Sequence, residues 1–415
     1  MLFEIPDREK AGAWLRDHEV AALALLVLIA AIARLGALLV LHEPVEGDAA
    51  SYLEMARTII GLGPMTDSYG NLAFYSPGYP MALSAWFRLT GAGIGAALLF
   101  NLLLGVVTTL LVHRITRVAT GSAPAALLAA AGYAVLVPAV AGAALLQRET
   151  LSAPLLLLFA LAVIALPHTR RPHLIAAAAG LAYGAGVLAG ASVILTALAA
   201  AVALLWRRAS VAETITAGLT FLAAAALMLL PWLVHVDHVL GRPVLTTNAG
   251  FNLYIGNNPA ANGWFVSIAD TPVGPAWHAM RATLGELGAT DRLGALARAY
   301  IIEQPAAVAL LGLKKLALFW LPDAPALHRG FAIAALRWVA IVEHLAIVGG
   351  ALAAIVAWRR RSVGERLLVL IIALFWAIHA AAYIIPRYHD PVMPLVLVLA
   401  AGIVAPRLFG GRPAA

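Results

Sequence analysis

Apolar runs as long as a bilayer is thick recur along almost the whole chain. A helix that crosses the hydrocarbon needs roughly 20 mostly apolar residues, and it is favoured there because it pairs its own backbone groups. Ten such runs lie near residues 20–42, 92–112, 123–142, 151–167, 174–190, 193–206, 215–234, 331–358, 367–385 and 392–406. We therefore expect an all-α, polytopic integral membrane protein with about ten transmembrane helices.

The composition supports this class and excludes several others. Hydrophobic residues make up 62% of the chain and charged residues 12%, too few charges for the surface of a soluble domain. The chain has no cysteine, which excludes disulfides, a cysteine nucleophile and thiolate-bound metals. The net charge of +7 comes mostly from Lys and Arg in short connections, where they suit membrane orientation and anionic lipids rather than nucleic acid.

Basic connections predict which side of the membrane each loop faces. They recur in every second connection, at Arg114 and Arg117, Arg170 and Arg171, Arg207 and Arg208, Arg359 to Arg361 with Arg366, and Arg407 with Arg412. Arg and Lys accumulate on the cytoplasmic side, so both termini are expected there. The mixed charges of the first 20 residues do not fit a cleaved signal peptide. The external segments are then 43–91, 143–150, 235–330 and 386–391.

We expect residues 1–415 to form one transmembrane domain without a separate soluble domain. The first external loop, 43–91, carries interfacial helices, and the long external loop, 235–330, suits a substrate cap. The alanine-rich, lysine-poor composition is typical of a GC-rich bacterial genome, so the expected location is the bacterial cytoplasmic membrane.

The run 306–321 is interpreted as an interfacial helix rather than a crossing. A full crossing would place Lys314 and Lys315 near its middle, where charge is costly, and would put the Arg359 cluster outside.

Acidic and aromatic residues open the first external loop. Glu46, Asp48 and Tyr52 lie at the start of a stretch whose apolar residues have helical spacing up to Ile60. The Asp48 carboxylate suits either a helix N-cap or catalytic acid–base work, and the sequence leaves both open. Tyr75 belongs to a proline-rich aromatic turn that suits either membrane anchoring or stacking on a sugar.

Charged residues also precede two later helices on the expected external side. Arg148 and Glu149 lie between two apolar runs, where a charged pair is costly unless the partners satisfy each other or a ligand. Arg387 lies just after an apolar run and suits a bidentate contact with a lipid phosphate. His389 suits either a structural hydrogen bond or proton transfer.

The segment 248–265 interleaves amide and aromatic side chains. Amides pair with hydroxyl groups and rings cover C–H faces, so this mixture suits a polyhydroxylated ligand, although Asn and Gly are also ordinary turn formers. The residues selected from it as sugar contacts are Asn252, Tyr254, Asn257 and Asn258.

Metal and nucleotide motifs are absent from the sequence. It has no HExxH, no paired DxD, no P-loop and no GxGxxG, and its twelve His residues are scattered. We expect no metal-ligand set and no required cofactor, with a divalent cation as an option.

Taken in order, these segments resemble the GT-C superfamily of membrane glycosyltransferases, in particular the bacterial protein O-mannosyltransferase and aminoarabinose transferase group, which uses polyprenyl-phosphate sugars. The resemblance runs across almost the whole chain. It rests on Glu46-Gly47-Asp48 with Tyr52, the turn Tyr75 to Pro80, Arg148-Glu149, Gly256 to Pro259, and Arg387-Tyr388-His389. Many relatives have Asp-Glu where this first loop has Gly-Asp, and no large external domain is expected after the last helix, so the acceptor stays open.

The resemblance implies a role for each selected residue. Asp48 would accept the acceptor proton or orient the sugar, and Glu149 is the second acidic candidate. The carrier phosphate would contact Arg387, Arg148, Lys314 or Lys315. The sugar or acceptor would contact Glu46, Tyr52, Tyr75, Asn252, Tyr254, Asn257, Asn258, Tyr388 and His389.

The implied reaction is transfer of a sugar from a polyprenyl monophosphate to a hydroxyl of a lipid, glycan or protein on the external face, with inversion. Two alternatives stay open: a polymerase or ligase that uses diphosphate-linked sugars, and a transporter or flippase. Transporters tend to show internal repeats, and the sequence shows none.

Overall fold

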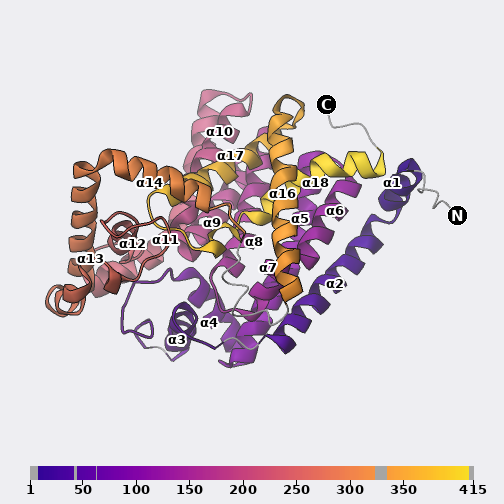
Figure 1. Ribbon diagram of the computed structural model, residues 1–415. Helices are drawn as coiled ribbons and strands as arrows, with labels where there is room; N and C mark the ends of the chain where they lie inside the picture. Colours follow the sequence, from indigo (N-terminus) through magenta and orange to yellow (C-terminus); the bar gives the residue numbers. More distant parts are fainter. Residues whose placement is uncertain (1–7, 42–43, 62, 323–333, 411–415) are drawn as a thin grey trace.

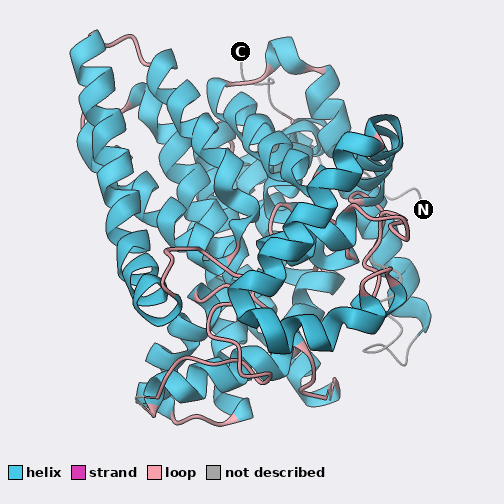
Figure 2. Ribbon diagram, turned by 90° about the vertical axis from the view of Figure 1, so that its left-hand side faces the viewer, coloured by secondary structure: helices cyan, strands magenta, loops and turns pink. Residues whose placement is uncertain are grey.

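The computed structural model describes residues 8–41, 44–61, 63–322 and 334–410. Within these ranges every regular element is a helix and there is no strand, apart from an isolated bridge between Trp264 and Ile384 (Figure 2). The expected all-α class is confirmed.

Seven helices of the described chain are long and apolar enough to cross a membrane, or up to nine if two bent pairs each count as one span. The seven are α2 (Glu19–Val40), α5 (Ile94–Thr120), α8 (Glu149–Ala165), α9 (Pro172–Ala189), α11 (Val211–Leu240), α16 (Ala334–Val356) and α17 (Val363–Ala377); α8 and α17 each continue into a 3-10 turn, so that their spans are Glu149–His168 and Val363–Ala380. The chain is therefore a multi-pass membrane protein, as predicted.

Two further apolar helices fall on predicted spans but are short. One is Ala191–Trp206, which contains α10 (Ala197–Trp206), and the other is α18 (Met393–Phe409). Both have fewer than 18 residues, and for this reason helix length alone supports seven to nine spans rather than the expected ten.

Small residues let α9 and α11 approach closely. A methyl group added at Gly180 would lie 2.2 Å from the carbonyl oxygen of Phe221, and one at Gly184 would lie 2.7 Å from Cβ of Met228. Close backbone approach through Gly and Ala is a common way for membrane helices to pack, because no hydrophobic effect separates them from lipid.

A break at Leu136 divides one span into α6 (Ala123–Val135) and α7 (Val137–Ala141), and the two parts are bent by 54°. The fully buried Arg34 of α2 donates to the carbonyl oxygens of Tyr133 at 3.4 Å and Ala134 at 3.1 Å, at the end of α6. Glu343 of α16 accepts from the backbone N–H of Val137 at 3.0 Å, at the start of α7. A cation at a helix C-terminus and an anion at a helix N-terminus both complement the peptide dipoles, so the two side chains cap the break.

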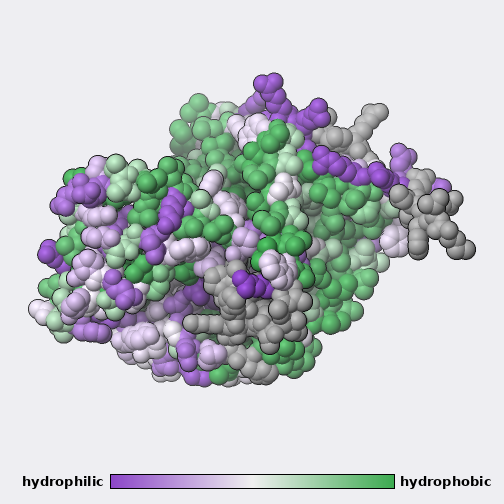
Figure 3. Space-filling model, in the orientation of Figure 1, coloured by the Kyte–Doolittle hydropathy of each residue, from purple (hydrophilic) through white to green (hydrophobic). Residues whose placement is uncertain are grey.

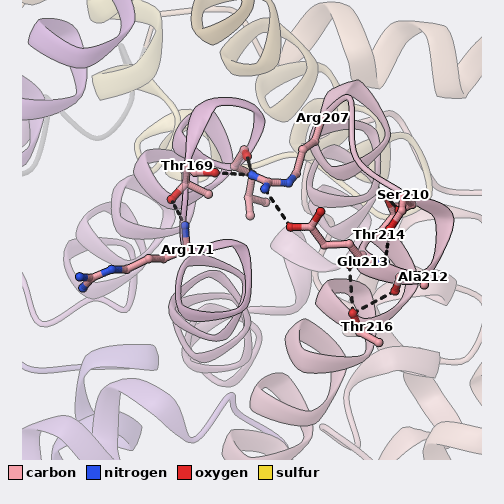
Figure 4. A network of polar contacts seen from close by, with 9 residues as sticks. Thr169, Arg171, Arg207, Ser210, Ala212, Glu213, Thr214 and Thr216 are labelled. Carbon is pink, nitrogen blue, oxygen red and sulfur yellow. Dashed lines mark hydrogen bonds and ion pairs between the residues drawn. The ribbon is translucent and has the colours of Figure 1, made fainter.

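The predicted cytoplasmic connections meet at one end of the bundle. Arg207 donates to the carbonyl oxygen of Thr169 and, at 2.9 Å, to Glu213, which joins the connection before α9 to the one before α11 (Figure 4). Ser362, just before α17, donates to the carbonyl oxygen of Ala119 near the end of α5 at 2.7 Å. Helix α1 (Arg8–Asp17) packs beside the end of α18 at the same end, far from α3 (Figure 1).

The opposite end, called the loop end, carries the two long predicted loops. The first contains α3 (Asp48–Ile60) and α4 (Gly78–Thr90). The second contains α12 (Ala249–Gly256), α13 (Trp277–Glu303) and α14 (Pro305–Leu318), with a bend of 108° between α13 and α14. Hydrophilic residues gather over the α13 region, whereas hydrophobic residues cover much of the helical bundle (Figure 3).

Candidate functional site

The candidate site lies at the loop end, where the start of α3 meets the turn η8 (Pro386–His389). Asp48 is the first residue of α3, and Gly47 before it has φ of +56°, a left-handed conformation that glycine adopts without strain. The N-cap position of α3 is occupied by Gly47 and not by Asp48. The Oδ2 of Asp48 instead accepts from Arg387 in an ion pair, and its Oδ1 accepts from the hydroxyl of Tyr75 at 3.1 Å. The helix cap, one of the two alternatives for Asp48, is therefore not formed.

Arg387 lies between two carboxylates. Its Nε is 3.6 Å from Oε1 of Glu149, the first residue of α8, while its NH2 pairs with Asp48. Oε1 of Glu149 is also 3.4 Å from Nε of Arg148, whose NH1 is 3.5 Å from the Ser76 hydroxyl. Four predicted site residues thus form a row of alternating charge, Asp48, Arg387, Glu149 and Arg148.

Burial distinguishes the two carboxylates. Glu149 is 5% exposed, and its Oε2 accepts no hydrogen bond from any residue in the described ranges. The Asp48 side chain keeps 39% of its surface accessible. Asp48 is therefore the carboxylate that faces solvent, and Glu149 is the buried charge that holds Arg387 and Arg148 together.

The charge row keeps both guanidinium groups protonated. Burial alone lowers the pKa of Arg387, but attraction to Glu149 and Asp48 outweighs it and the pKa rises above its ordinary value. Burial alone also lowers the pKa of Arg148, but its interactions with Tyr52 and Glu149 outweigh burial, and the pKa is raised. Burial, with the Asp48 charge beside it, raises the pKa of the Tyr75 hydroxyl well above its usual range, so Tyr75 stays a hydrogen-bond donor.

An aromatic cluster supports Asp48 from the side of α4. The ring of Tyr52 packs edge-on against Tyr75 at 5.4 Å and against Tyr79 at 5.6 Å between ring centroids. The Tyr79 hydroxyl donates to Asn101 of α5 at 2.8 Å, and Asn101 donates to the carbonyl oxygen of Leu145 at 2.7 Å. Tyr52 is 2% exposed, so it acts on the site by packing.

The main cavity of about 440 Å³ opens beside the Asp48–Arg387 pair. Its polar lining consists of Glu46, Asp48, Gln147 and Arg387. Its apolar lining comes from the ends of α2 and α5 and the segments around them: Leu38, Leu41, Pro44, Val45, Ala49, Ile94, Leu98, Ala144, Leu145 and Leu146. The cavity therefore joins an ionic end to an apolar wall on membrane-spanning helices.

An inner cavity of about 50 Å³ lies behind Glu149. It shares Gln147 with the main cavity and is also lined by His344, His389 and Asp390. His389 is 2% exposed and its Nδ1 lies 3.0 Å from the carbonyl oxygen of Phe319. Burial, reinforced by His344, lowers the pKa of His389 to about 3, so its imidazole is neutral at physiological pH.

The amide side chains of segment 248–265 have hydrogen-bond partners outside the charge row. Asn257 is 2% exposed, donates to the carbonyl oxygens of Leu253 and Ala381, and lies 3.3 Å from Nζ of the fully buried Lys315. Asn258 donates to the carbonyl oxygen of Tyr254 at 2.8 Å.

Three more residues were predicted to contact the substrate: Asn252, Tyr388 and Lys314. Asn252 accepts from the Tyr383 hydroxyl at 3.3 Å. The ring of Tyr388 lies 6.1 Å from that of Tyr383. Lys314 is exposed, and its side chain lies near Gly263. The structure thus brings Asp48, Glu149, Arg387, Arg148, Tyr75 and Glu46 together, whereas segment 248–265 approaches them through Tyr383 and Phe74.

Two groups of site residues were not selected from the sequence. Asn101 ties Tyr79 to the segment before α8, and the leucines of α2 and α5 form the apolar wall. An amide inside an apolar run was the available signal for Asn101, whereas the leucines look like any lipid-facing residues. Among the described residues no group of three or more His, Asp or Glu side chains is arranged to hold a metal ion.

Comparisons with known proteins find similarity to membrane glycosyltransferases. Residues 75–235, less than half of the chain, match the family described as dolichyl-phosphate-mannose-protein mannosyltransferase. This range includes Tyr75, Arg148 and Glu149 but not Asp48 or Arg387. No curated protein sequence matches the chain.

Two solved structures illustrate the similarity. The oligosaccharyltransferase of Archaeoglobus fulgidus is 18% identical with a TM-score of 0.52, and the match covers 93% of this chain and 49% of that protein. The chain thus spans about half the length of that relative. ArnT from Cupriavidus metallidurans, solved bound to undecaprenyl phosphate, is 16% identical with a TM-score of 0.46 over 91% of this chain and 77% of ArnT.

The matched family and the matched Archaeoglobus fulgidus structure are both glycosyltransferases, as the sequence predicted. The chain therefore has the polytopic fold of the GT-C glycosyltransferases, and the resemblance expected from its motifs is confirmed.

Proposed function

We propose that the chain transfers a sugar from a polyprenyl-monophosphate carrier to an acceptor hydroxyl, on the external face of a bacterial cytoplasmic membrane. The observation that carries the proposal is the Asp48–Arg387 pair at the ionic end of a cavity whose other wall is apolar. A polyprenyl-phosphate sugar is likewise polar at one end and apolar along the rest: its charged phosphate and sugar lie at one end of a long hydrocarbon.

Arg387 is the proposed contact for the carrier phosphate. A guanidinium presents donors in a fork that matches two oxygens of one phosphate. Its side chain is 31% exposed and lines the main cavity, so a ligand reaches it without unfolding the site. The leucines of α2 and α5 would lie along the first isoprene units of the carrier.

The proposed reaction breaks the bond between the anomeric carbon and the phosphate oxygen, and forms a bond from that carbon to the acceptor oxygen. The acceptor proton passes to Asp48, and the electron pair of the broken bond leaves with the carrier phosphate. Direct displacement inverts the anomeric centre. General-base assistance of this kind typically contributes about 10²- to 10⁴-fold.

The charge row supplies the positive charge that the leaving phosphate needs. Arg387 stabilises it directly, and Glu149 with Arg148 keeps that guanidinium in place. We therefore propose that transfer requires no metal ion and that turnover persists in the presence of EDTA. Glu46 and Asp48 are two carboxylates on the cavity wall that would hold a divalent cation if the reaction used one, and EDTA sensitivity would reveal this alternative.

The name of the matching family supports a monophosphate donor, since dolichyl-phosphate mannose carries its sugar on a polyprenyl monophosphate. The test is turnover by the purified wild type in nanodiscs on matched polyprenyl monophosphate and diphosphate sugars, with water-soluble sugar phosphates as controls. We expect turnover of a monophosphate donor. Turnover of the diphosphate series instead would support a polymerase or ligase.

A further inference from the structure

A strap of nine residues, 67–75, joins the first loop to α13. It begins in a compact turn in which the Asp67 carboxylate accepts from the backbone N–H groups of Tyr69 and Asn71, each at 2.8 Å. The Asn71 side chain donates to the same carboxylate at 2.6 Å, and both Asp67 and Asn71 are 4% exposed. The turn is thus held by its own hydrogen bonds.

On one side the strap contacts α3, the helix that begins with Asp48. The hydroxyl groups of Ser68 and Ser51 are 2.8 Å apart. At the other end of the strap, the Tyr75 hydroxyl donates to Asp48 Oδ1 at 3.1 Å. The strap therefore sets the direction from which Asp48 receives a hydrogen bond.

On the other side a single carboxylate of α13 holds the strap. Glu286 accepts from the backbone N–H of Leu72 at 2.8 Å and of Ala73 at 3.1 Å, and it also accepts from the Thr247 hydroxyl. Arg281, five residues earlier on α13, donates to the side chain of Asn71. These contacts join segments more than 200 residues apart in the sequence.

The backbone of α13 is shaped to present this carboxylate. Gly285 has φ of +68°, a conformation outside the helix that suits glycine, and Glu286 follows it directly. Ala73, which Glu286 holds, lies two residues before Tyr75. A short segment, Ala73 to Tyr75, thus connects the residue that Glu286 holds to the hydroxyl that contacts Asp48.

We propose that Glu286 is a positioning residue for the transfer reaction: it holds the strap so that Tyr75 orients the Asp48 carboxylate toward the reacting centre. Glu286 itself touches neither Asp48 nor Arg387 in any recorded contact and acts through Tyr75. This inference rests on the proposed function, because it needs a reaction in which Asp48 takes part.

The test is a double-mutant cycle on kcat, with the active member of a panel of synthetic polyprenyl-phosphate hexoses and pentoses as donor. Glu286→Gln replaces one acceptor oxygen by an NH2 group that faces a backbone N–H. Tyr75→Phe removes the hydroxyl that donates to Asp48. Each change should lower kcat about 10-fold with little change in the donor KM, since each weakens one hydrogen bond to a charged carboxylate. The double variant should be no slower than Tyr75→Phe alone, because both changes act on one interaction.

A matched control lies on the same helix. Asp291 pairs with Arg242 at 2.8 and 2.9 Å on the exposed side of α13 and has no recorded contact with the strap. Asp291→Asn should leave kcat unchanged. Arg281→Gln, which frees Asn71 from α13 but leaves Glu286 in place, is the second variant should Glu286→Gln fail to fold; it should lower kcat and again add nothing to Tyr75→Phe.

Multiplicative effects of Glu286→Gln and Tyr75→Phe, or an unchanged kcat in Glu286→Gln, would overturn the positioning role while leaving the proposed function intact. If Asp48→Asn loses turnover while either of these results is found for Glu286→Gln, the proposed function stands and the positioning role of Glu286 does not. Absence of wild-type turnover with every donor of the panel would overturn both.

Discussion

Arg387, near the end of the chain, donates to the carboxylate of Asp48, which lies 339 residues earlier. The pair joins the first loop to the turn before the last helix, and Glu149 lies behind it 3.6 Å from the Arg387 Nε. The three residues come from α3, α8 and η8, so the site exists only when these parts of the bundle are assembled. Its chemistry depends on this packing.

Replacing Arg387 tests the phosphate contact. Arg387→Met removes the cation beside the leaving group and should lower kcat about 10²- to 10³-fold, the range for loss of one donor that stabilises developing charge. Arg387→Lys keeps the charge but loses the fork, so an intermediate loss is expected. Steady-state kinetics with a polyprenyl-phosphate sugar measure both. Arg242→Gln, in the exposed pair with Asp291, is the control, and an active Arg387→Met would remove Arg387 from the mechanism.

The pH dependence should not depend on His389. Its pKa is lowered to about 3 by burial, so the imidazole is neutral between pH 5 and 8, and His389→Gln should leave the pH profile of kcat unchanged there. A group whose folded pKa lies below its unfolded value binds fewer protons when folded, so wild-type stability should fall as pH drops from about 6.5 toward 3. In His389→Gln this part of the fall should be absent from melting curves recorded against pH. An inflection near pH 6.5 in the wild-type pH profile of kcat that disappears in His389→Gln would show instead that His389 titrates during the reaction.

Gly105→Ala should destabilise the bundle through Arg34. An added methyl group at Gly105 would lie 2.2 Å from Nε and 2.7 Å from Cδ of Arg34, so the guanidinium would have to leave the carbonyl oxygens that it caps at the α6–α7 break. Overpacking of this kind costs typically about 1–3 kcal/mol. Thermal unfolding in detergent measures the loss. Gly95→Ala in the same helix has nothing within 4 Å and should melt like the wild type; equal melting of both variants would show that Arg34 moves freely.

Membrane orientation is directly testable because the chain has no cysteine. We expect Asp270→Cys, an exposed position of the long loop, to react with a membrane-impermeant maleimide added outside intact cells. Arg208→Cys, an exposed position among the basic connections, should react only after the membrane is permeabilised. The reversed labelling pattern would place the site on the cytoplasmic side.

The membrane spans were predictable because the bilayer imposes them on the sequence. The run near 215–234 corresponds to α11, Val211–Leu240, and the run near 20–42 corresponds to α2, Glu19–Val40. The structure also keeps the basic connections at one end, as the charge pattern indicated. The break at Leu136 was not predicted, since its Arg34 and Glu343 caps come from two other helices.

The candidate site was predictable as a set of residues but not as an arrangement. The motifs identified Asp48, Glu149 and Arg387, whereas their contacts arise from packing between distant segments. Asn257 and Asn258 were selected because amides suit sugars, yet the structure engages these amides with backbone carbonyls and Lys315. Amide composition cannot distinguish a ligand contact from a buried backbone partner, and their role as sugar contacts remains a prediction.

The most direct test of the account is sugar release from a panel of polyprenyl-phosphate sugars by purified wild type and Asp48→Asn in nanodiscs. We predict that the wild type releases carrier phosphate from one donor with inversion at the transferred sugar. Asp48→Asn should still bind that donor but lose turnover by at least about 10²-fold, the loss expected for a general base. Full turnover by Asp48→Asn, or no wild-type turnover with any donor, would contradict the account.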